Sequence, residues 1–501
     1  MKYEVVFITG QSPSNQILSR FAGVHRLATE LRNVNISTKV LIGLGYYDIN
    51  DYIQLVDNFI DEKTLVLGVS TTFFVEYSTR YSNCHTTLYN GQTHISDMQL
   101  ICNWIKSKYP AIKIVVGGPS ARKRIKDFKN IDLIVEGYAD VLLKDYVQSI
   151  KERGRCSPVL TTYNGVPFIS NPLGGDFDFR NSKILFEDED GIMPGETLPL
   201  EISRGCIFRC KFCSFPLRGK SVSDNSYLKC EDNIKNELMR NYEKWGTTTY
   251  TFVDDTFNDS VEKLSNLHKI ITSLPFKLKF SAYIRADLLH AYPETIDMMH
   301  EMGIVGAFFG IESLNDRARK TASKGFSAEK NLRVLETVNK KWTDTVITSS
   351  FIYGLPNDTP DTMRQWTEQI FNCGVFDNHD VIVQPLYLLG SEATYATDFD
   401  KEMDKHGYEY VGGGTQWTNT VTTFKEMVDM SEDTHRRLRD TVRPFGGFQF
   451  ATLLGYGIPF DKLRMLNSNS VQDIDYIENL TKQKFNHYLD IIKNDSSPNN
   501  S

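Results

Sequence analysis

Long apolar runs are absent from this 501-residue sequence. A helix that crosses a bilayer needs about twenty mostly apolar residues, and no run here comes near that length. We therefore expect no membrane span. Residues 1–10 read as a strand and lack the longer apolar core of a signal peptide, so we do not expect secretion.

An excess of positive charge is absent as well. The chain has 56 Lys and Arg residues against 63 Asp and Glu residues, which gives a net charge of −7. This balance argues against a broad phosphate-binding surface, so we expect no nucleic-acid partner. A small molecule, a lipid or a peptide is the expected class of substrate.

Cysteine is scarce, with eight residues in the chain and no pattern of a disulfide framework. A reducing cytoplasm is therefore the expected location. Three of the eight lie close together as Cys206, Cys210 and Cys213, in the spacing C-x3-C-x2-C, after a short apolar run and a turn. Because thiolates are the ligands that select iron–sulfur clusters or zinc, this loop predicts a soft-metal centre.

The number of nearby thiols distinguishes an iron–sulfur cluster from a zinc site. A structural zinc ion needs four ligands, and the nearest further thiol, Cys230, lies seventeen residues on without a C-x-x-C partner. Three thiolates on a cubane cluster leave one iron open, which a catalytic centre requires. We therefore favour a cluster, and the alternative is a non-catalytic zinc-bearing binding protein.

The cysteine spacing, with Phe212 directly before the third thiol, resembles the radical S-adenosylmethionine (SAM) superfamily. The resemblance implies that Cys206, Cys210 and Cys213 hold a [4Fe–4S] cluster and that SAM binds the open iron. Reductive cleavage of SAM would give a 5′-deoxyadenosyl radical, which removes hydrogen from an unactivated carbon. The electron would come from a donor such as flavodoxin or ferredoxin.

Residues 1–152 alternate strand-like and helix-like segments, which predicts an α/β fold with a doubly wound parallel sheet. Ligands of such sheets bind beyond the carboxyl ends of the strands. The residues found there resemble those of the cobalamin-binding domain in one large class of the radical SAM superfamily. The resemblance implies cobalamin contacts at Ser70, Thr71, Gly117, Gly118, Glu136 and Gly137.

One motif of that class is missing. Members that supply a lower axial histidine carry D-x-H-x-x-G after the first strand, where this chain reads Gly10-Gln-Ser-Pro. His25 falls on the next helix, at the boundary of its apolar face, and we do not expect it to bind cobalt. The alternative is therefore a radical SAM enzyme without cobalamin that performs rearrangement, cyclisation or oxidation.

Residues 153–196 have little periodicity and predict a linker, with a small hairpin at Asn164-Gly165. We expect its acidic run, residues 187–190, to be solvated.

Residues 197–390 contain six strand–helix units, with strand candidates at 198–202, 249–253, 279–284, 305–311, 346–353 and 381–386. Such repeats predict a closed or partly closed parallel barrel whose chemistry lies at the carboxyl ends of the strands. Six units match the partial (β/α)6 TIM-type barrel of the radical SAM family. Helix caps are expected at Ser260, at Ser327 and at Thr359, which precedes a proline.

Polar residues at the ends of these strands resemble the SAM contacts of the family. Besides Phe212, the resemblance implies roles for Asp254 and Asp255 at the amino group, Arg285 at the carboxylate, Glu312 and Ser313 in a G-I-E-S sequence, and Gly354 beside the adenine. Lys324-Gly325 matches a stretch that closes over the site. The two aspartates could equally cap a helix, and Glu312 could pair with a nearby Arg or Lys.

Beyond residue 390 the resemblance thins. We expect residues 391–501 to form a mostly helical region that caps the barrel and shapes the substrate site. Trp417 fits either a substrate pocket or buried packing. The sequence thus predicts a radical SAM enzyme, and within that class a cobalamin-dependent methyltransferase.

Overall fold

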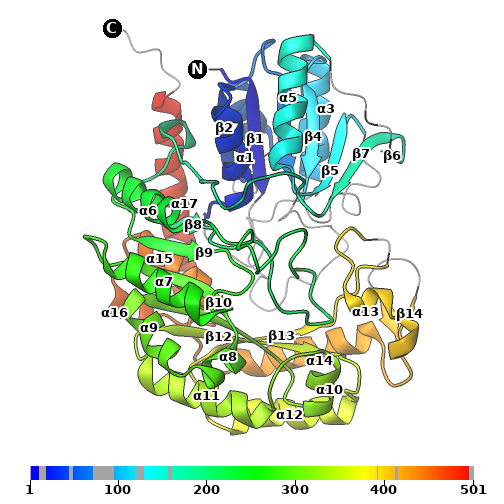
Figure 1. Ribbon diagram of the computed structural model, residues 1–501, viewed down its shortest axis with the longest axis vertical. Coiled ribbons are helices and arrows are strands. Elements are labelled where there is room, and N and C mark those ends of the chain that lie inside the picture. The colour runs from blue at the N-terminus through cyan, green and yellow to red at the C-terminus, as the bar shows by residue number, and fades with distance from the viewer. Residues whose placement is uncertain are drawn as a thin grey trace. The chain divides into compact units, whose positions relative to one another are not determined.

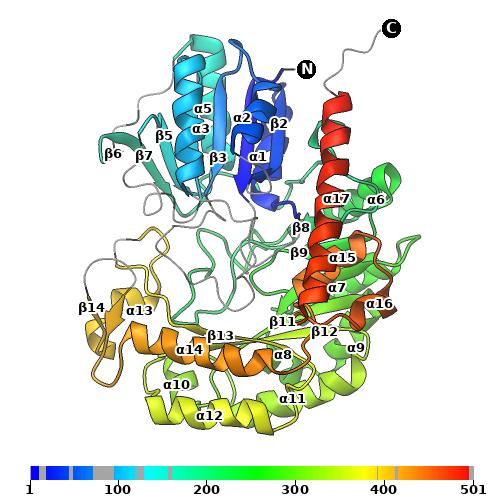
Figure 2. The same cartoon turned by 180° about the vertical axis from the view of Figure 1, so that it is seen from behind.

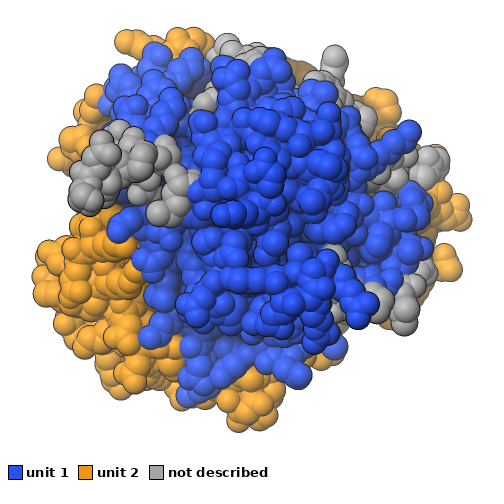
Figure 3. All heavy atoms as spheres, turned by 90° about the horizontal axis from the view of Figure 1, so that it is seen from above, with its two compact units in different colours: residues 1–82, 86–194, 476–501 blue, residues 83–85, 195–475 orange. Residues whose placement is uncertain are grey.

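The computed structural model describes residues 2–10, 18–44, 49–71, 95–118, 121, 129–155, 159, 161–391, 393–411 and 416–495 (Figure 1). These residues form two compact units, which Figure 3 colours separately. Unit 1 contains the described residues up to 194 together with 476–495, and unit 2 contains residues 195–475. Residues 476–495, which we grouped with the C-terminal region from the sequence, therefore pack with the N-terminal residues.

Unit 1 is built on a seven-stranded sheet with the order β2-β1-β3-β4-β5-β7-β6. Its strands are β1 (Val5–Gly10), β2 (Thr38–Leu44), β3 (Val66–Ser70), β4 (Lys113–Gly117), β5 (Leu133–Gly137), β6 (Thr162–Tyr163) and β7 (Val166–Asn171). All neighbours pair in parallel except β6 with β7. The predicted doubly wound sheet is confirmed. Its order places a switch point between β1 and β3, where ligands of such sheets bind.

The helices of unit 1 follow the strands, as the alternating pattern predicts. They are α1 (Ala22–Arg32), α2 (Ile49–Asp57), α3 (Ile95–Lys108) and α5 (Asp140–Arg153). Strands rich in Val and Ile are buried along most of their length, because helices cover such sheets on both faces. The predicted hairpin forms at Asn164-Gly165, where both φ angles are positive, as a type I′ turn requires. Its second strand, β7, extends the sheet.

Helix α17 (Val471–Asp495) packs against β2, the edge strand of this sheet. The amide of Ile42 in β2 donates a hydrogen bond to the hydroxyl of Tyr488 at 3.3 Å. A Cβ atom at Gly43 would lie 2.4 Å from the ring of Phe485, and Gly43 has a φ of +84°. Glycine is therefore needed for the helix to approach. Covering an edge strand also prevents it from pairing with another chain.

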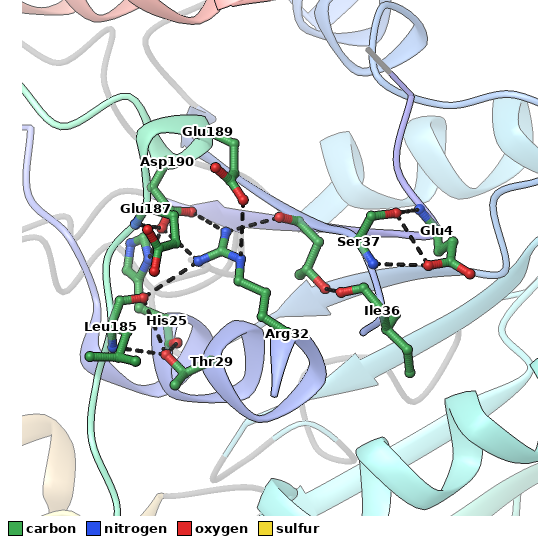
Figure 4. A network of polar contacts seen from close by, with 11 residues as sticks. Glu4, His25, Thr29, Arg32, Ile36, Ser37, Leu185, Glu187, Glu189 and Asp190 are labelled. Carbon is green, nitrogen blue, oxygen red and sulfur yellow. Dashed lines mark hydrogen bonds and ion pairs between the residues drawn. The ribbon is translucent and has the colours of Figure 1, made fainter. Parts of the chain in front are cut away.

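The acidic run at 187–190 is bound by two arginines, of which Figure 4 shows Arg32. Both carboxylate oxygens of Asp190 accept hydrogen bonds from Arg32, at 2.8 and 2.7 Å. Arg20 donates to the carbonyl oxygens of Asp190 and Gly191 at 2.6 and 2.7 Å. Since Asp190 is 0% exposed, our expectation that the whole run is solvated is wrong. These hydrogen bonds instead attach residues 187–191 to Arg20 and Arg32, near the start of the chain.

His25 belongs to the same buried network (Figure 4). Its ring is 0% exposed and lies 4.7 Å from that of Phe186, so the expected boundary position is wrong. Nδ1 is 3.8 Å from a carboxylate oxygen of Asp190, and neither ring nitrogen has a hydrogen-bond partner among the described residues. Burial lowers the pKa of His25 to about 3, although Asp190 opposes the shift.

We expect His25 to make unit 1 less stable in acid. Its pKa is 6.5 in the unfolded chain and about 3 in the fold, so between these values the unfolded chain binds the extra proton. The free energy of unfolding is then undiminished above pH 6.5 and falls toward pH 3, by up to about 1.4 kcal/mol per pH unit. Denaturant unfolding of the wild type and of His25→Leu at several pH values measures this slope. The Leu variant should show a flatter dependence, and an equal slope in both proteins would contradict the prediction.

Unit 2 contains a six-stranded parallel sheet whose strands follow the chain order, β13-β12-β11-β10-β9-β8. The strands are β8 (Leu198–Leu200), β9 (Thr249–Phe252), β10 (Lys279–Ile284), β11 (Ile304–Glu312), β12 (Val346–Tyr353) and β13 (Asp380–Pro385). All six expected strands are present. In the pairing order, β8 and β13 are the two edges of the sheet.

Helices connect successive strands of unit 2. They are α6 (Glu231–Trp245), α7 (Val261–Thr272), α8 (Ala286–Ala291), α9 (Glu294–Met302), α10 (Asp316–Thr321), α11 (Ala328–Lys341) and α12 (Pro360–Asn372). The predicted caps are confirmed, because Ser260, Ser327 and Thr359 each accept a hydrogen bond from an amide in the first helical turn. Within the described part of the chain, no helix has both the length and the apolar character needed to cross a membrane.

The C-terminal part of unit 2 follows β13, and two of its helices pack on the sheet. It comprises α13 (Asp398–Lys401), β14 (Glu409–Tyr410), β15 (Trp417–Thr418), α14 (Phe424–Arg439), α15 (Gly447–Gly455) and α16 (Phe460–Arg464). Helix α14 runs along the edge strand β13 (Figure 2). Val383 of β13 donates its amide to Nε2 of His435 at 3.3 Å, and Ser431 donates to the Val383 carbonyl at 2.6 Å.

Helix α15 packs across β9, β10 and β11. Its Phe448 ring lies 4.6 Å from that of Tyr283 and 6.2 Å from that of Phe308, measured between centroids. At Gly306 the helix approaches the strand so closely that a Cβ atom would lie 2.2 Å from the carbonyl oxygen of Gly447. Within the C-terminal region, α15 is thus seated directly on the sheet.

We expect Gly306→Ala to destabilise unit 2, because the added methyl group would force α15 away from β11. Overpacking of this kind costs about 1–3 kcal/mol, which denaturant unfolding can measure. Gly23→Ala is the control, since a Cβ at that helical position meets no atom within 4 Å. The control should be neutral or slightly stabilising. Equal stability of the Gly306→Ala variant and the wild type would contradict the packing.

Candidate active site

The three cysteines lie in an irregular loop that follows β8 and folds back on itself. The amide of Cys206 donates to the carbonyl of Phe215 at 2.8 Å, and the amide of Leu217 donates to the carbonyl of Cys206 at 2.9 Å. The amide of Cys213 donates to the carbonyl of Cys210 at 2.9 Å. These bonds keep the three thiols on one short stretch at the carboxyl end of the sheet.

Hydrogen-bonding groups surround the sulfur atoms. The contacts are Thr256 Oγ1 at 3.1 Å from Cys206, Arg285 Nη1 at 3.2 Å from Cys210 and the Phe215 amide at 3.4 Å from Cys213. Groups that donate to sulfur stabilise a thiolate and tune the potential of a cluster bound to it. Neighbouring strand ends therefore converge on the loop, since Thr256 follows β9 and Arg285 follows β10.

The chemistry of this donor set fits an iron–sulfur cluster. Cys206 and Cys210 are only 8% and 9% exposed, and burial raises the pKa of Cys213 to about 12. The thiols therefore need the positive charge of a metal to bind as thiolates. Among the described residues, no three His, Cys, Asp or Glu side chains converge as ligands of a single ion. A cubane cluster binds each thiolate at its own iron and does not require such convergence.

The two aspartates after β9 have different environments. Asp254 is 1% exposed and accepts hydrogen bonds from the hydroxyl of Ser203 and the amide of Ile202. Burial raises the pKa of both aspartates, that of Asp255 to about 7, where the charge of Asp254 adds to the effect. Asp255 is only half-buried and accepts from the amide of Gly205 at 3.1 Å. Asp254 thus supports the loop from within, while Asp255 lies closer to solvent.

A buried lysine joins the loops that follow β8 and β9. The ammonium of Lys263 donates to the hydroxyl of Ser203 at 3.1 Å and to the carbonyl of Thr256 at 3.0 Å. It also lies 3.1 Å from a carboxylate oxygen of Asp259 and 3.7 Å from one of Asp254. The loops after β8 and β9 therefore share one buried positive charge.

Glu312, at the end of β11, has a strained backbone and a buried ion pair. Its φ of +70° is rare for a residue other than glycine, and such strain collects at functional sites. Its carboxylate lies 3.0 Å from the ammonium of Lys324, which itself lies 5.9 Å from the ring centroid of Phe212. The structure thus brings Phe212, Glu312 and Lys324 together.

Ser313 is fully buried and donates its hydroxyl to Asp358 at 3.3 Å. Asp358 also accepts from the side-chain amide of Asn315 at 2.8 Å, and burial raises the pKa of Asp358 to about 6. These bonds join the segment after β11 to the segment after β12. The hydroxyl of Ser313 is therefore already hydrogen-bonded to Asp358 within the protein.

Arg319, on the short helix α10, binds backbone carbonyls on two sides of the same site. Nη1 donates to the carbonyls of Ile311 and Ser313 at 2.5 and 3.1 Å. Nη2 donates to Gly325 at 2.7 Å, and Nε donates to Phe326 at 3.1 Å. One buried guanidinium thus holds the end of β11 against the Lys324-Gly325 turn.

Gly354, at the end of β12, is surrounded by the C-terminal part of unit 2. With a φ of +84°, its Cα lies so close to Trp417 that a Cβ would be 2.6 Å from the indole. Its amide donates to the sulfur of Met363 at 3.2 Å, and its carbonyl accepts from Tyr408 at 2.5 Å. Trp417 is buried and donates to the carbonyl of Leu386 at 2.8 Å, so it has a packing role.

In unit 1, the residues assigned to cobalamin lie along the carboxyl ends of β3, β4 and β5. Thr71 donates its amide and its hydroxyl to the carbonyl of Gly117, at 2.8 and 3.0 Å. The amide of Gly118 donates to the carbonyl of Val135 at 3.3 Å. Glu136 is buried, whereas Ser70 and Gly137 are partly exposed. The expected residues therefore form a continuous rim along this edge.

Sequence reasoning did not find Lys263, Arg319 or Asp358. Each acts through backbone groups or through residues that are distant in sequence, and none belongs to a motif that carries a ligand. A charged residue on the otherwise buried face of a short helix, as at Arg319, is the one local signal that could have indicated such a role.

We expect Arg319→Met to loosen the Lys324-Gly325 turn and the end of β11. Hydrogen bonds from a charged donor contribute about 1.5–3 kcal/mol each, so amide exchange at residues 311–313 and 324–326 should accelerate by at least about tenfold. Hydrogen–deuterium exchange with mass spectrometry measures this directly. Arg317→Met is the matched control, because Arg317 is an exposed arginine on the same helix. Equal protection in the two variants would contradict the assigned role.

Residues 200–370 match the family model of the Radical SAM superfamily. Among curated relatives, an uncharacterized methyltransferase of Pyrococcus horikoshii is 24% identical over 271 residues, which cover 50% of this chain and 56% of that protein. The ribosomal protein uS12 methylthiotransferase RimO of Pelodictyon phaeoclathratiforme is 25% identical over 194 residues, which cover 37% of this chain and 43% of that protein. The chain thus spans about half the length of these relatives.

Two solved structures share the fold over most of the chain. The radical SAM methyltransferase TsrM of Kitasatospora setae, with cobalamin and a [4Fe–4S] cluster bound, has a TM-score of 0.57 and 15% identity, and the match covers 83% of this chain and 82% of TsrM. The cobalamin-dependent radical enzyme OxsB has a TM-score of 0.53 and 15% identity, with 97% and 72% covered. The family match implies a [4Fe–4S] cluster and SAM as cofactors. This chain carries a radical SAM domain at residues 200–370 and has the fold of the cobalamin-dependent radical SAM enzymes TsrM and OxsB.

Proposed function

We propose that this protein is a radical SAM enzyme that uses cobalamin to methylate an unactivated carbon. The observation that carries the proposal is the loop of three thiols, with a hydrogen-bonding group at each sulfur, inside the region that matches the family. When bound there, the cluster supplies the electron that cleaves SAM. The likeness to TsrM, a methyltransferase with cobalamin bound, supports methyl transfer as the outcome.

We assign the amino group of SAM to Asp255. Its half-buried carboxylate has a pKa raised to about 7 by burial and by Asp254. A nearby ammonium group favours the ionised form, so binding would bring the pKa of Asp255 back down. Asp254, held by Ser203 and Ile202, would keep the loop in place.

We assign the ribose and methionine ends of SAM to the neighbourhood of Glu312, with Phe212 and Lys324 beside it. Ser313, bound to Asp358, would contribute by fixing the position of Glu312. Gly354 would contribute by packing on Trp417, because Met363 and Tyr408 already bind its amide and carbonyl. The Lys324-Gly325 turn would help to exclude water from the radical, which protects it from side reactions.

We assign cobalamin to the rim of unit 1 formed by Ser70, Thr71, Gly117, Gly118, Glu136 and Gly137. The rim lies where ligands of such sheets bind. The φ angles of Gly118 and Gly137 are +139° and +113°, which side chains rarely adopt, and glycine lets the backbone approach a ligand closely.

A second candidate is a radical SAM enzyme that works without cobalamin. The missing D-x-H-x-x-G motif favours it, and so does the complete burial of His25, which leaves that residue no access to cobalt. The expected reactions are then rearrangement, cyclisation or oxidation.

The partners follow from the chemistry. An electron donor such as flavodoxin or ferredoxin would reduce the cluster, and the substrate would be a small molecule, a lipid or a peptide. A cluster of this kind needs reducing surroundings, which suits the cytoplasm.

Metal analysis tests the proposal and separates its alternatives. Protein reconstituted without oxygen, in the presence of hydroxocobalamin, should contain about four irons and one cobalt per chain. Iron without cobalt would support the second candidate. Zinc in place of iron would contradict both enzymes and favour a binding protein.

Cys210→Ala should abolish reductant-dependent formation of 5′-deoxyadenosine, because a cluster ligand is lost. Cys230→Ala is the matched control and should retain the activity, since Cys230 lies outside the loop, before helix α6. Liquid chromatography of the reaction products measures both. Deoxyadenosine formation by the Cys210 variant would refute the cluster assignment.

A further inference from the structure

The guanidinium of Arg285 is already bound by residues of the protein itself. We assigned it to the carboxylate of SAM from the sequence. In the structure, Nε and Nη2 donate to the two carboxylate oxygens of Asp287, at 3.0 and 2.5 Å. This is the forked geometry in which arginine binds a carboxylate. One carboxylate-binding edge of Arg285 is therefore filled by its own neighbour.

The rest of the guanidinium is directed at the cysteine loop. Nη1 donates to the sulfur of Cys210 at 3.2 Å. The centre of the guanidinium lies 4.0 Å from the centroid of the Phe208 ring, so this aromatic residue of the same loop packs against the planar group. Arg285 is 7% exposed. Its charge is thus buried between Asp287, Phe208 and the thiol.

The backbone around Arg285 is fixed as well. The side chain of Asn258 accepts from the amide of Arg285 at 2.9 Å and donates to its carbonyl at 3.0 Å. A Cβ atom at Gly325 would lie 2.4 Å from Asp287, so the turn after α10 closes directly on the ion pair. Arg285 is therefore held at Cys210 from several sides, independently of any ligand.

We propose that Arg285 sets the reduction potential of the cluster by donating to Cys210, with Asp287 as the residue that positions it. This inference rests on the cluster assigned under the proposed function. Reduction adds one negative charge to the cluster. A positive hydrogen-bond donor at a ligand sulfur stabilises that charge and so raises the potential.

The test is a redox titration of the reconstituted protein without SAM, followed by electron paramagnetic resonance. Arg285→Met should bind as much iron as the wild type but have a lower potential. At a fixed applied potential, the ratio of reduced to oxidised cluster should fall by about tenfold, which corresponds to about 59 mV for a one-electron couple. Arg317→Met removes an exposed arginine and should leave the potential unchanged.

Equal potentials in the wild type and an iron-loaded Arg285→Met variant would overturn the inference. Weaker SAM binding at an equal potential would instead restore the carboxylate assignment. If the Met variant binds too little iron, Arg285→Gln is titrated in its place, because glutamine removes the positive charge but keeps a polar side chain. A lowered potential in that variant supports the inference and an unchanged one refutes it. Wild-type protein that binds no iron would contradict the proposed function itself.

Discussion

The cost of burying charge governs how the loops at the strand ends are arranged. An ion left unpaired inside a protein costs several kcal/mol, so each needs partners that stay in place. Lys263 meets this need for the loops after β8 and β9, and it joins Ser203 to Thr256. Arg32 and Asp190 do the same in unit 1, across 158 residues of sequence. Each pair therefore fixes the position of a loop while it neutralises a charge.

The elements that could be predicted from the sequence are those set by local chemistry. Short runs of Val, Ile and Leu predicted the parallel strands of both sheets, because burial on both faces leaves no polar alternation. Ser260 and Thr359 were recognised as helix caps, since a cap is defined by a side chain and an amide three residues later. The cysteine loop was equally local, with all three thiols within eight residues.

What could not be predicted depends on contacts between distant residues. The periodicity of α17 is the same wherever the helix packs, so nothing in it pointed to β2. His25 looked like a boundary residue on its own helix, but its ring is buried beside Phe186 and Asp190, which lie far away in the sequence. Arg319 binds only backbone carbonyls, and no residue type marks the carbonyls it binds. For α17 and His25 the deciding partner lies far away in the sequence, and for Arg319 it is a set of nearby backbone carbonyls that no residue pattern marks.

The ion pairs and hydrogen bonds within the protein also indicate which of the residues assigned to SAM a ligand could bind without displacing a partner. A ligand that binds to Arg285 has to compete with Asp287, and one that binds to Glu312 has to compete with Lys324. The carboxylate of Asp255, a partly exposed residue, accepts a hydrogen bond from the backbone amide of Gly205. Burial and the charge of Asp254 raise its pKa, so the fold does not balance the negative charge of Asp255. A cationic group gains most where such an imbalance exists. We therefore propose that, among the strand-end residues, Asp255 is the one that binds SAM, and that Asp254, Ser313 and Gly354 mainly hold the site in shape.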